Sequence, residues 1–81
     1  MTLEEVIAKF QEIFIDVLDN EDITLKYETT AADIDEWDSL TNIQIVVAIE
    51  KFFKVRFSSS EIESFKNVGE MCEATLKKIN G

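Results

Sequence analysis

The chain has 81 residues, of which 46% are hydrophobic, with six Phe, one Trp, a single Cys and no His. This composition predicts one small folded domain over residues 1–81, and the single Cys excludes an internal disulfide. The net charge of −9 opposes binding to nucleic acid. The absence of His excludes Ser-His and Cys-His nucleophile pairs and His-ligated metal sites.

Residues 2–20 show the first periodic pattern. Their apolar side chains recur every three or four residues, which predicts one face of a long amphipathic helix. Thr2 and Glu5 form a capping-box pattern at its start, and a polar run ends the pattern near Asn20.

Residues 21–38 show no sustained period, which predicts a long connection rather than a helix. Apolar residues are scattered along it and predict an ordered connection that is anchored to the core. The expected anchors are Ile23, Leu25, Tyr27, Ile34 and Trp37.

A second helix is expected over residues 39–53, with Asp38 as its N-cap. At about 100° per residue its apolar side chains fall on two faces. The expected core face comprises Ile45, Ile49 and Phe53, flanked by Val46 and Phe52. The other face holds Leu40, Ile43 and Val47 beside Gln44, Lys51 and Lys54, and is a candidate partner surface. The alternative is that a crowded bundle buries both faces.

Two further helices complete the predicted fold. Ser58–Ser60 predict the capped start of a short turn around Ile62 and Phe65, and Asn67 with Glu70 predicts the start of a last helix. The apolar face of that helix holds Val68, Met71, Cys72, Thr75, Leu76 and Ile79, so Cys72 is expected to be a buried structural thiol. The sequence predicts an all-α bundle of three long helices and one short helix.

The segment Asp38-Ser39-Leu40 is the candidate site. A serine at the first helical position has its hydroxyl near the free backbone N–H groups of the helix start, which favours a phosphate that is attached to the chain or rests against it. Because the chain has no His, Ser39 has no base of its own and is expected to act only when a partner enzyme activates it. The alternative is that Asp38 and Ser39 only cap a helix.

The residues around this segment carry a wider resemblance. Asp35 to Leu40, followed by Ile43, Ile45, Val46, Ile49, Glu50 and Phe53, resemble the acyl carrier protein family, and the resemblance covers the whole chain. It implies an acyl-carrier-like four-helix bundle with a long loop between helices 1 and 2. It also implies a non-catalytic carrier on which a phosphopantetheinyl transferase attaches 4′-phosphopantetheine, from coenzyme A, to Ser39. The thiol of that arm would carry acyl groups as thioesters.

The resemblance assigns further residues by position. Asp38 matches the aspartate beside the attachment serine. Asp35, Leu40, Ile43, Gln44, Val47 and Glu50 are expected to contact partner enzymes, namely an acyl-loading ligase or transferase and downstream biosynthetic enzymes. Ile45, Val46, Ile49 and Phe53 are expected to line a cleft for the acyl chain. No catalytic or metal-binding residue is expected.

Some positions depart from housekeeping members of the family. Thr41 and Gln44 stand where acids are usual, Lys51 stands where an acid is common, and Trp37 precedes the motif where small residues are usual. These departures indicate a carrier for a specialised pathway, of fatty-acid-like or polyketide-like type. A carrier of an activated amino acid, of aminoacyl or D-alanyl type, stays open. An unmodified acidic helical adaptor is the alternative of another class.

The environment of the protein is predicted from what the sequence lacks. No apolar run approaches the roughly 18 residues that a membrane-spanning helix needs, and the N-terminus has no secretory-signal pattern. With its single Cys, the chain is expected to be a cytoplasmic monomer without membrane insertion.

Overall fold

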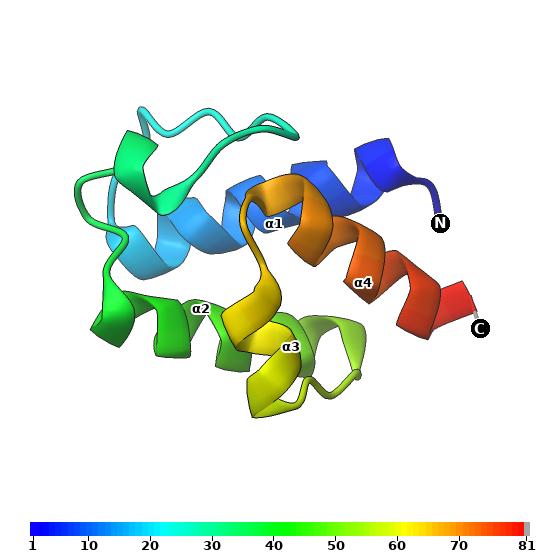
Figure 1. Cartoon of the computed structure of the whole chain (residues 1–81). Coiled ribbons are helices and arrows are strands. Elements are labelled where there is room, and N and C mark those ends of the chain that lie inside the picture. Colours follow the sequence, from blue (N-terminus) through cyan, green and yellow to red (C-terminus); the bar gives the residue numbers. More distant parts are fainter. Residues whose placement is uncertain (81) are drawn as a thin grey trace.

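The computed structural model describes residues 1–80 and contains four α-helices around one core. The elements in chain order are α1 (Leu3–Leu18), the 3-10 turn η1 (Ala31–Asp33), α2 (Ser39–Phe53), α3 (Ser59–Ser64) and α4 (Val68–Asn80). Three of these helices are long and one is short, and a long loop joins α1 to α2 (Figure 1). The predicted all-α fold is therefore confirmed. No helix among residues 1–80 is long and apolar enough to cross a membrane.

The first helix begins and ends where its residues dictate. Thr2 and Glu5 form both hydrogen bonds of the predicted capping box. The side chains that it buries recur every four residues and are Val6, Phe10, Phe14 and Leu18. Asp19 ends the helix in the left-handed region at φ 53°, one residue before the predicted end at Asn20. This face of α1 therefore forms one side of the core, and α2 and α4 pack against it.

The connection from α1 to α2 is ordered, as predicted. Four of its five expected anchors, Ile23, Leu25, Ile34 and Trp37, are buried. The fifth, Tyr27, is 39% exposed, because its ring lies across the backbone of Gly69 at the surface rather than in the core. The loop also caps α4, since the N–H groups of Val68 and Gly69 donate to the carbonyls of Thr29 (2.8 Å) and Tyr27 (2.7 Å).

The two faces of α2 are distinct. Ile45, Val46 and Ile49 are buried, and the half-buried Phe53 packs against Phe10 with ring centroids 5.9 Å apart. The second predicted face is exposed: Leu40, Ile43 and Val47 are 68%, 62% and 42% exposed. The alternative in which both faces are buried is therefore wrong.

One α2 side chain differs from the prediction. Phe52 was expected to flank the core but is 53% exposed. It lies at the outer edge of the α1–α2 contact, where its ring meets Phe53 edge-on and the ammonium of Lys9 is 5.7 Å from its centroid. Packing against these two side chains replaces burial.

The C-terminal helices follow their predicted caps. Ser58 and Glu61 form a capping box at the start of α3, and the side chain of Asn67 accepts the backbone N–H of Glu70 in the first turn of α4. Cys72 is fully buried, and desolvation raises the pKa of its thiol to about 12, so the predicted structural thiol is confirmed. Ile79, expected on the packed face, is 37% exposed in the last turn.

Candidate functional site

The start of α2 is organised by the Asp38 side chain. Its Oδ1 atom accepts the backbone N–H groups of Leu40 and Thr41, each at 2.9 Å. Hydrogen bonds from Thr41 and Leu40 lower the pKa of Asp38, and this effect outweighs the opposing desolvation. Asp38 therefore remains ionised near neutral pH and acts as an N-cap, as predicted.

Thr41 completes this cap from the other side. Its hydroxyl oxygen accepts the backbone N–H of Asp38 at 2.8 Å, and the hydroxyl donates to the carbonyl of Glu36 at 2.8 Å. A threonine thus supplies the reciprocal half of the capping box. From the family resemblance, position 41 was interpreted only as a place where an acid is missing. The structure shows that the neutral Thr41 side chain completes the helix cap.

Ser39 is the first residue of α2 and is exposed. Its hydroxyl makes no hydrogen bond to another group within residues 1–80. The nearby N–H groups are already occupied, because Leu40 and Thr41 donate to the Asp38 carboxylate and Asn42 donates to the Asp38 carbonyl at 2.8 Å. The expectation that free N–H groups of the helix start lie beside Ser39 is therefore wrong for these three. What remains is an accessible hydroxyl on a hydrogen-bonded helix start.

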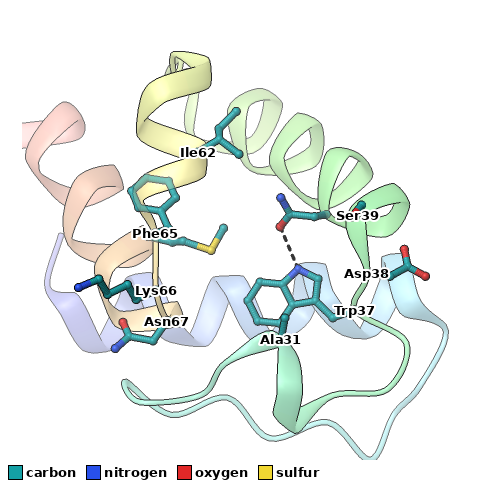
Figure 2. Close-up of a pocket in the computed structure, with 10 residues that line it drawn as sticks. Ala31, Trp37, Asp38, Ser39, Ile62, Phe65, Lys66 and Asn67 are labelled. Atoms are coloured by element: carbon teal, nitrogen blue, oxygen red, sulfur yellow. Dashed lines mark hydrogen bonds between the residues drawn. The ribbon is translucent and has the colours of Figure 1, made fainter.

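Trp37 fixes the loop against the first turn of α2. The indole is 8% exposed and meets Phe14 edge-on at 4.8 Å between ring centroids. Its Nε1–H donates to Oδ1 of Asn42 at 2.9 Å (Figure 2). The tryptophan thus ties the residues that precede Ser39 both to α1 and to α2.

A pocket of about 390 Å³ opens beside Ser39. Figure 2 shows it between the start of α2, α3 and the start of α4. Its lining residues are Ala31, Trp37, Asp38, Ser39, Asn42, Ile62, Phe65, Lys66, Asn67 and Met71. The predicted attachment serine therefore lies on the rim of a cavity that is large enough for a small ligand.

The residues predicted to line an acyl-chain cleft lie elsewhere. Ile45, Val46 and Ile49 belong to the packed core, Phe53 lies at its edge, and none of the four lines this pocket. Their role toward cargo stays a prediction. The apolar lining from Ile62, Phe65 and Met71 was not predicted as a site. The signals in the sequence were the apolar Ile62 and Phe65 of the short third helix and the place of Met71 on the apolar face of the last helix, and neither says what these helices cover.

The residues predicted to contact partner enzymes are mostly at the surface. Leu40, Ile43, Gln44 and Val47 are exposed on α2, and Asp35 is exposed in the loop that leads to Ser39. Glu50 differs, because it is half-buried and its Oε2 atom accepts the backbone N–H of Phe57 at 2.9 Å. Its carboxylate therefore holds the turn after α2.

Charge is unevenly distributed along this surface. The exposed acids Asp35, Glu36 and Asp38 lie around the start of α2. A groove of about 450 Å³ lies at the other end of the helix. Its lining residues are Val47, Glu50, Lys51, Lys54, Val55 and Arg56. Three of these residues, Lys51, Lys54 and Arg56, are cations, and neither ion pair formed within residues 1–80 involves them. The groove therefore presents positive charge on a chain of net charge −9.

Comparison with known proteins extends this picture. A family model described as "Phosphopantetheine attachment site" matches residues 8–75. The acyl carrier protein of Petrotoga mobilis is 33% identical, and the match covers 99% of this chain and 94% of that protein. That of Cyanidium caldarium is 31% identical, with 99% and 93% covered.

A solved structure agrees with the sequence comparison. The solution NMR structure of a holo acyl carrier protein from Geobacter metallireducens superimposes with a TM-score of 0.88 at 36% identity, covering 93% of this chain and 86% of that one. The range of the family model, residues 8–75, includes Asp38, Ser39 and the rest of the candidate site. This chain belongs to the acyl carrier protein family and is a non-catalytic carrier that bears a phosphopantetheine arm.

Proposed function

We propose that Ser39 is the residue that carries the arm. The observation that carries this proposal is the position of an exposed serine at the first residue of a capped helix and on the rim of the pocket. The other serines are placed differently. Ser58 caps α3, the Ser64 hydroxyl donates to the Glu61 carbonyl, and Ser59 and Ser60 do not line the pocket.

The attachment step follows from the residues present. The Ser39 oxygen attacks the pyrophosphate of coenzyme A at the phosphorus that bears pantetheine. A Ser–O–P bond forms, the P–O bond of the anhydride breaks and 3′,5′-adenosine bisphosphate leaves. The hydroxyl proton passes to a base of the transferase, because the chain has no His. When attached, the arm supplies a thiol that holds acyl groups as thioesters.

This proposal is tested by intact-protein mass after incubation with coenzyme A and a broad-specificity phosphopantetheinyl transferase. We expect one added arm on the wild-type chain and on Ser60→Ala, and none on Ser39→Ala. Ser60 is the matched control because it is also an exposed serine near a helix start. If several competent transferases leave the wild type unmodified, or if Ser39→Ala is still modified, Ser39 is not the attachment site.

We propose that the outer side of α2, together with Asp35, is where the transferase and later enzymes bind. The exposed apolar residues Leu40, Ile43 and Val47 support this, because an exposed apolar stripe next to an attachment site favours protein contacts. Gln44 and Glu50 border the stripe. Asp35→Lys is expected to slow arm attachment more at low salt than at high salt, since exposed charges are screened. An effect that does not change with salt would refute steering by this charge.

We also propose that the partner enzymes belong to a specialised pathway. Lys51 supports this, because it stands where an acid is common in housekeeping members of the family. Together with Lys54 and Arg56 it makes one end of the proposed partner surface positive. We further propose that the chain is cytoplasmic and monomeric and that it forms a single domain. Offering the holo protein to fatty-acyl and aminoacyl ligases in competition separates an acyl cargo from an activated amino acid. Preferential aminoacylation would refute the acyl cargo.

A further inference from the structure

Two asparagines lie on the wall of the pocket, and each amide has a fixed orientation. Oδ1 of Asn42 accepts the indole Nε1–H of Trp37 at 2.9 Å. Oδ1 of Asn67 accepts the backbone N–H of Glu70 at 2.9 Å. Indole and backbone N–H groups can only donate, so the atom that faces each of them must be the amide oxygen. Both NH₂ groups are therefore left for other partners.

The remaining polar side chains of the pocket extend this pattern. The Asp38 carboxylate is engaged by the N–H groups of Leu40 and Thr41. The Lys66 ammonium can only donate, and no ion pair within residues 1–80 involves it. Once Ser39 is esterified, its hydroxyl is no longer a donor. Apart from Asp38, the charged and amide side chains of this pocket thus offer hydrogen-bond donors.

The apolar part of the wall has a complementary composition. Trp37, Ile62, Phe65 and Met71 contribute ring, branched and thioether surface. The edge of the indole is the point where this surface meets the Asn42 amide. Such a cavity accepts a carbon chain, and Asn42 and Asn67 bring amide donors to its wall.

We propose that this pocket selects acyl groups that bear an oxygen acceptor beyond the thioester, such as 3-oxoacyl chains, over fully reduced alkyl chains. Asn42 and Asn67 are the specificity-determining residues, and Trp37 is a positioning residue that holds the Asn42 amide. A carbonyl oxygen regains the hydrogen bonds that the amides make to water in the open pocket, whereas an alkyl chain would leave them unpaired. The inference rests on the proposed attachment at Ser39 and narrows the class of cargo.

The test uses the full chain with the arm already bearing its cargo. A broad-specificity transferase attaches either octanoyl- or 3-oxooctanoyl-phosphopantetheine from the corresponding acyl-coenzyme A, and intact mass verifies loading. The rate of thioester cleavage by hydroxylamine is measured and divided by the rate for the same acyl pantetheine free in solution. This ratio removes the intrinsic reactivity of each thioester and reports shelter by the protein.

The matched variants are Asn42→Asp and Asn67→Asp. Each keeps the oxygen that accepts from Trp37 or from Glu70 and replaces only the NH₂ group. Asn80→Asp, on the exposed end of α4 and outside the pocket, adds the same charge as a control. In the wild type and the control, we expect shelter of the 3-oxo chain to exceed that of the octanoyl chain by about threefold to tenfold, the range for one net hydrogen bond. Asn42→Asp and Asn67→Asp should reduce that preference.

A second readout observes the donors directly. In ¹⁵N-labelled protein, the side-chain NH₂ resonances of Asn42 and Asn67 should shift when the 3-oxo chain replaces the octanoyl chain, and that of Asn80 should not. Equal shelter of both chains in the wild type would overturn the proposal. So would an equal loss of shelter for both chains in the variants, because the donors would then hold the arm itself. Failure of loading at Ser39 is visible by mass and would instead refute the attachment proposal.

Discussion

Replacing Trp37 with Phe tests whether the indole N–H holds the start of α2. Phenylalanine keeps an aromatic ring against Phe14 but removes the donor to Asn42. The indole is only 8% exposed, and a phenyl ring in its place offers no donor to Asn42. The Asn42 carbonyl therefore loses its partner in the variant.

The expected loss of stability has two parts. The missing hydrogen bond accounts for about 1 kcal/mol. The smaller ring buries less apolar surface and accounts for about 1 kcal/mol more at roughly 25 cal/mol per Å². For a domain of this size a loss of about 2 kcal/mol is a large part of the total stability and should lower Tm by about 8–16 °C.

The assay is urea unfolding followed by far-UV circular dichroism for the wild type, Trp37→Phe, Asn42→Ala and the double variant. If the hydrogen bond is responsible, the two single losses should not add, and a coupling of about 0.5–1.5 kcal/mol should remain. Amide hydrogen exchange in the first turn of α2 should also accelerate in Trp37→Phe. Strict additivity would refute the reasoning, because Trp37 would then stabilise the fold only through its buried surface.

Three further experiments test other parts of the fold. Gly69→Ala should lose about 1–3 kcal/mol in urea unfolding, because a Cβ would collide with the ring of Tyr27; the loss should shrink in a Tyr27→Ala background, and an unchanged loss would exclude that collision. The Cys72 thiol should react with iodoacetamide only when the chain unfolds, because burial raises its pKa to about 12; rapid alkylation under native conditions would contradict this. The lowered pKa of Asp38 stabilises the fold above the unfolded-state pKa, and this contribution is lost as pH falls through the folded-state pKa. Asn also caps helices, so Tm measured below about pH 4 should fall more steeply in the wild type than in Asp38→Asn; parallel curves would refute this role of Asp38.

The periodic parts of the chain were predictable because the spacing of apolar residues along a helix indicates which of its faces is buried. A repeat of three and four residues in α1 gave the face that carries Phe10 and Phe14, and the two apolar rows of α2 gave one buried and one exposed face. Local capping patterns at Thr2 and Ser58 also predicted helix starts, since a cap involves only neighbouring residues.

Features that depend on distant segments were not predictable in the same way. The pocket exists because α3 and the start of α4 lie opposite Ser39, and no local pattern encodes that placement. Trp37 was predicted to anchor the loop and is buried, but its contacts with Phe14 and Asn42 join separate segments, and no local pattern predicted these two partners. Tyr27 was expected in the core, but its actual partner, Gly69, lies far along the chain.

The two sides of α2 explain how such a carrier can change partners without changing its fold. Leu40, Ile43 and Val47, which belong to the proposed partner surface, take no part in the core, so we expect substitutions there to alter binding while the buried contacts of Ile45 and Ile49 persist. The pocket wall is more constrained, because the Asn42 side chain that would meet cargo also accepts the hydrogen bond of the loop. Under the two proposals, the selection of partners is free to vary at the surface, whereas the selection of cargo is coupled to the stability of the helix that begins at Ser39.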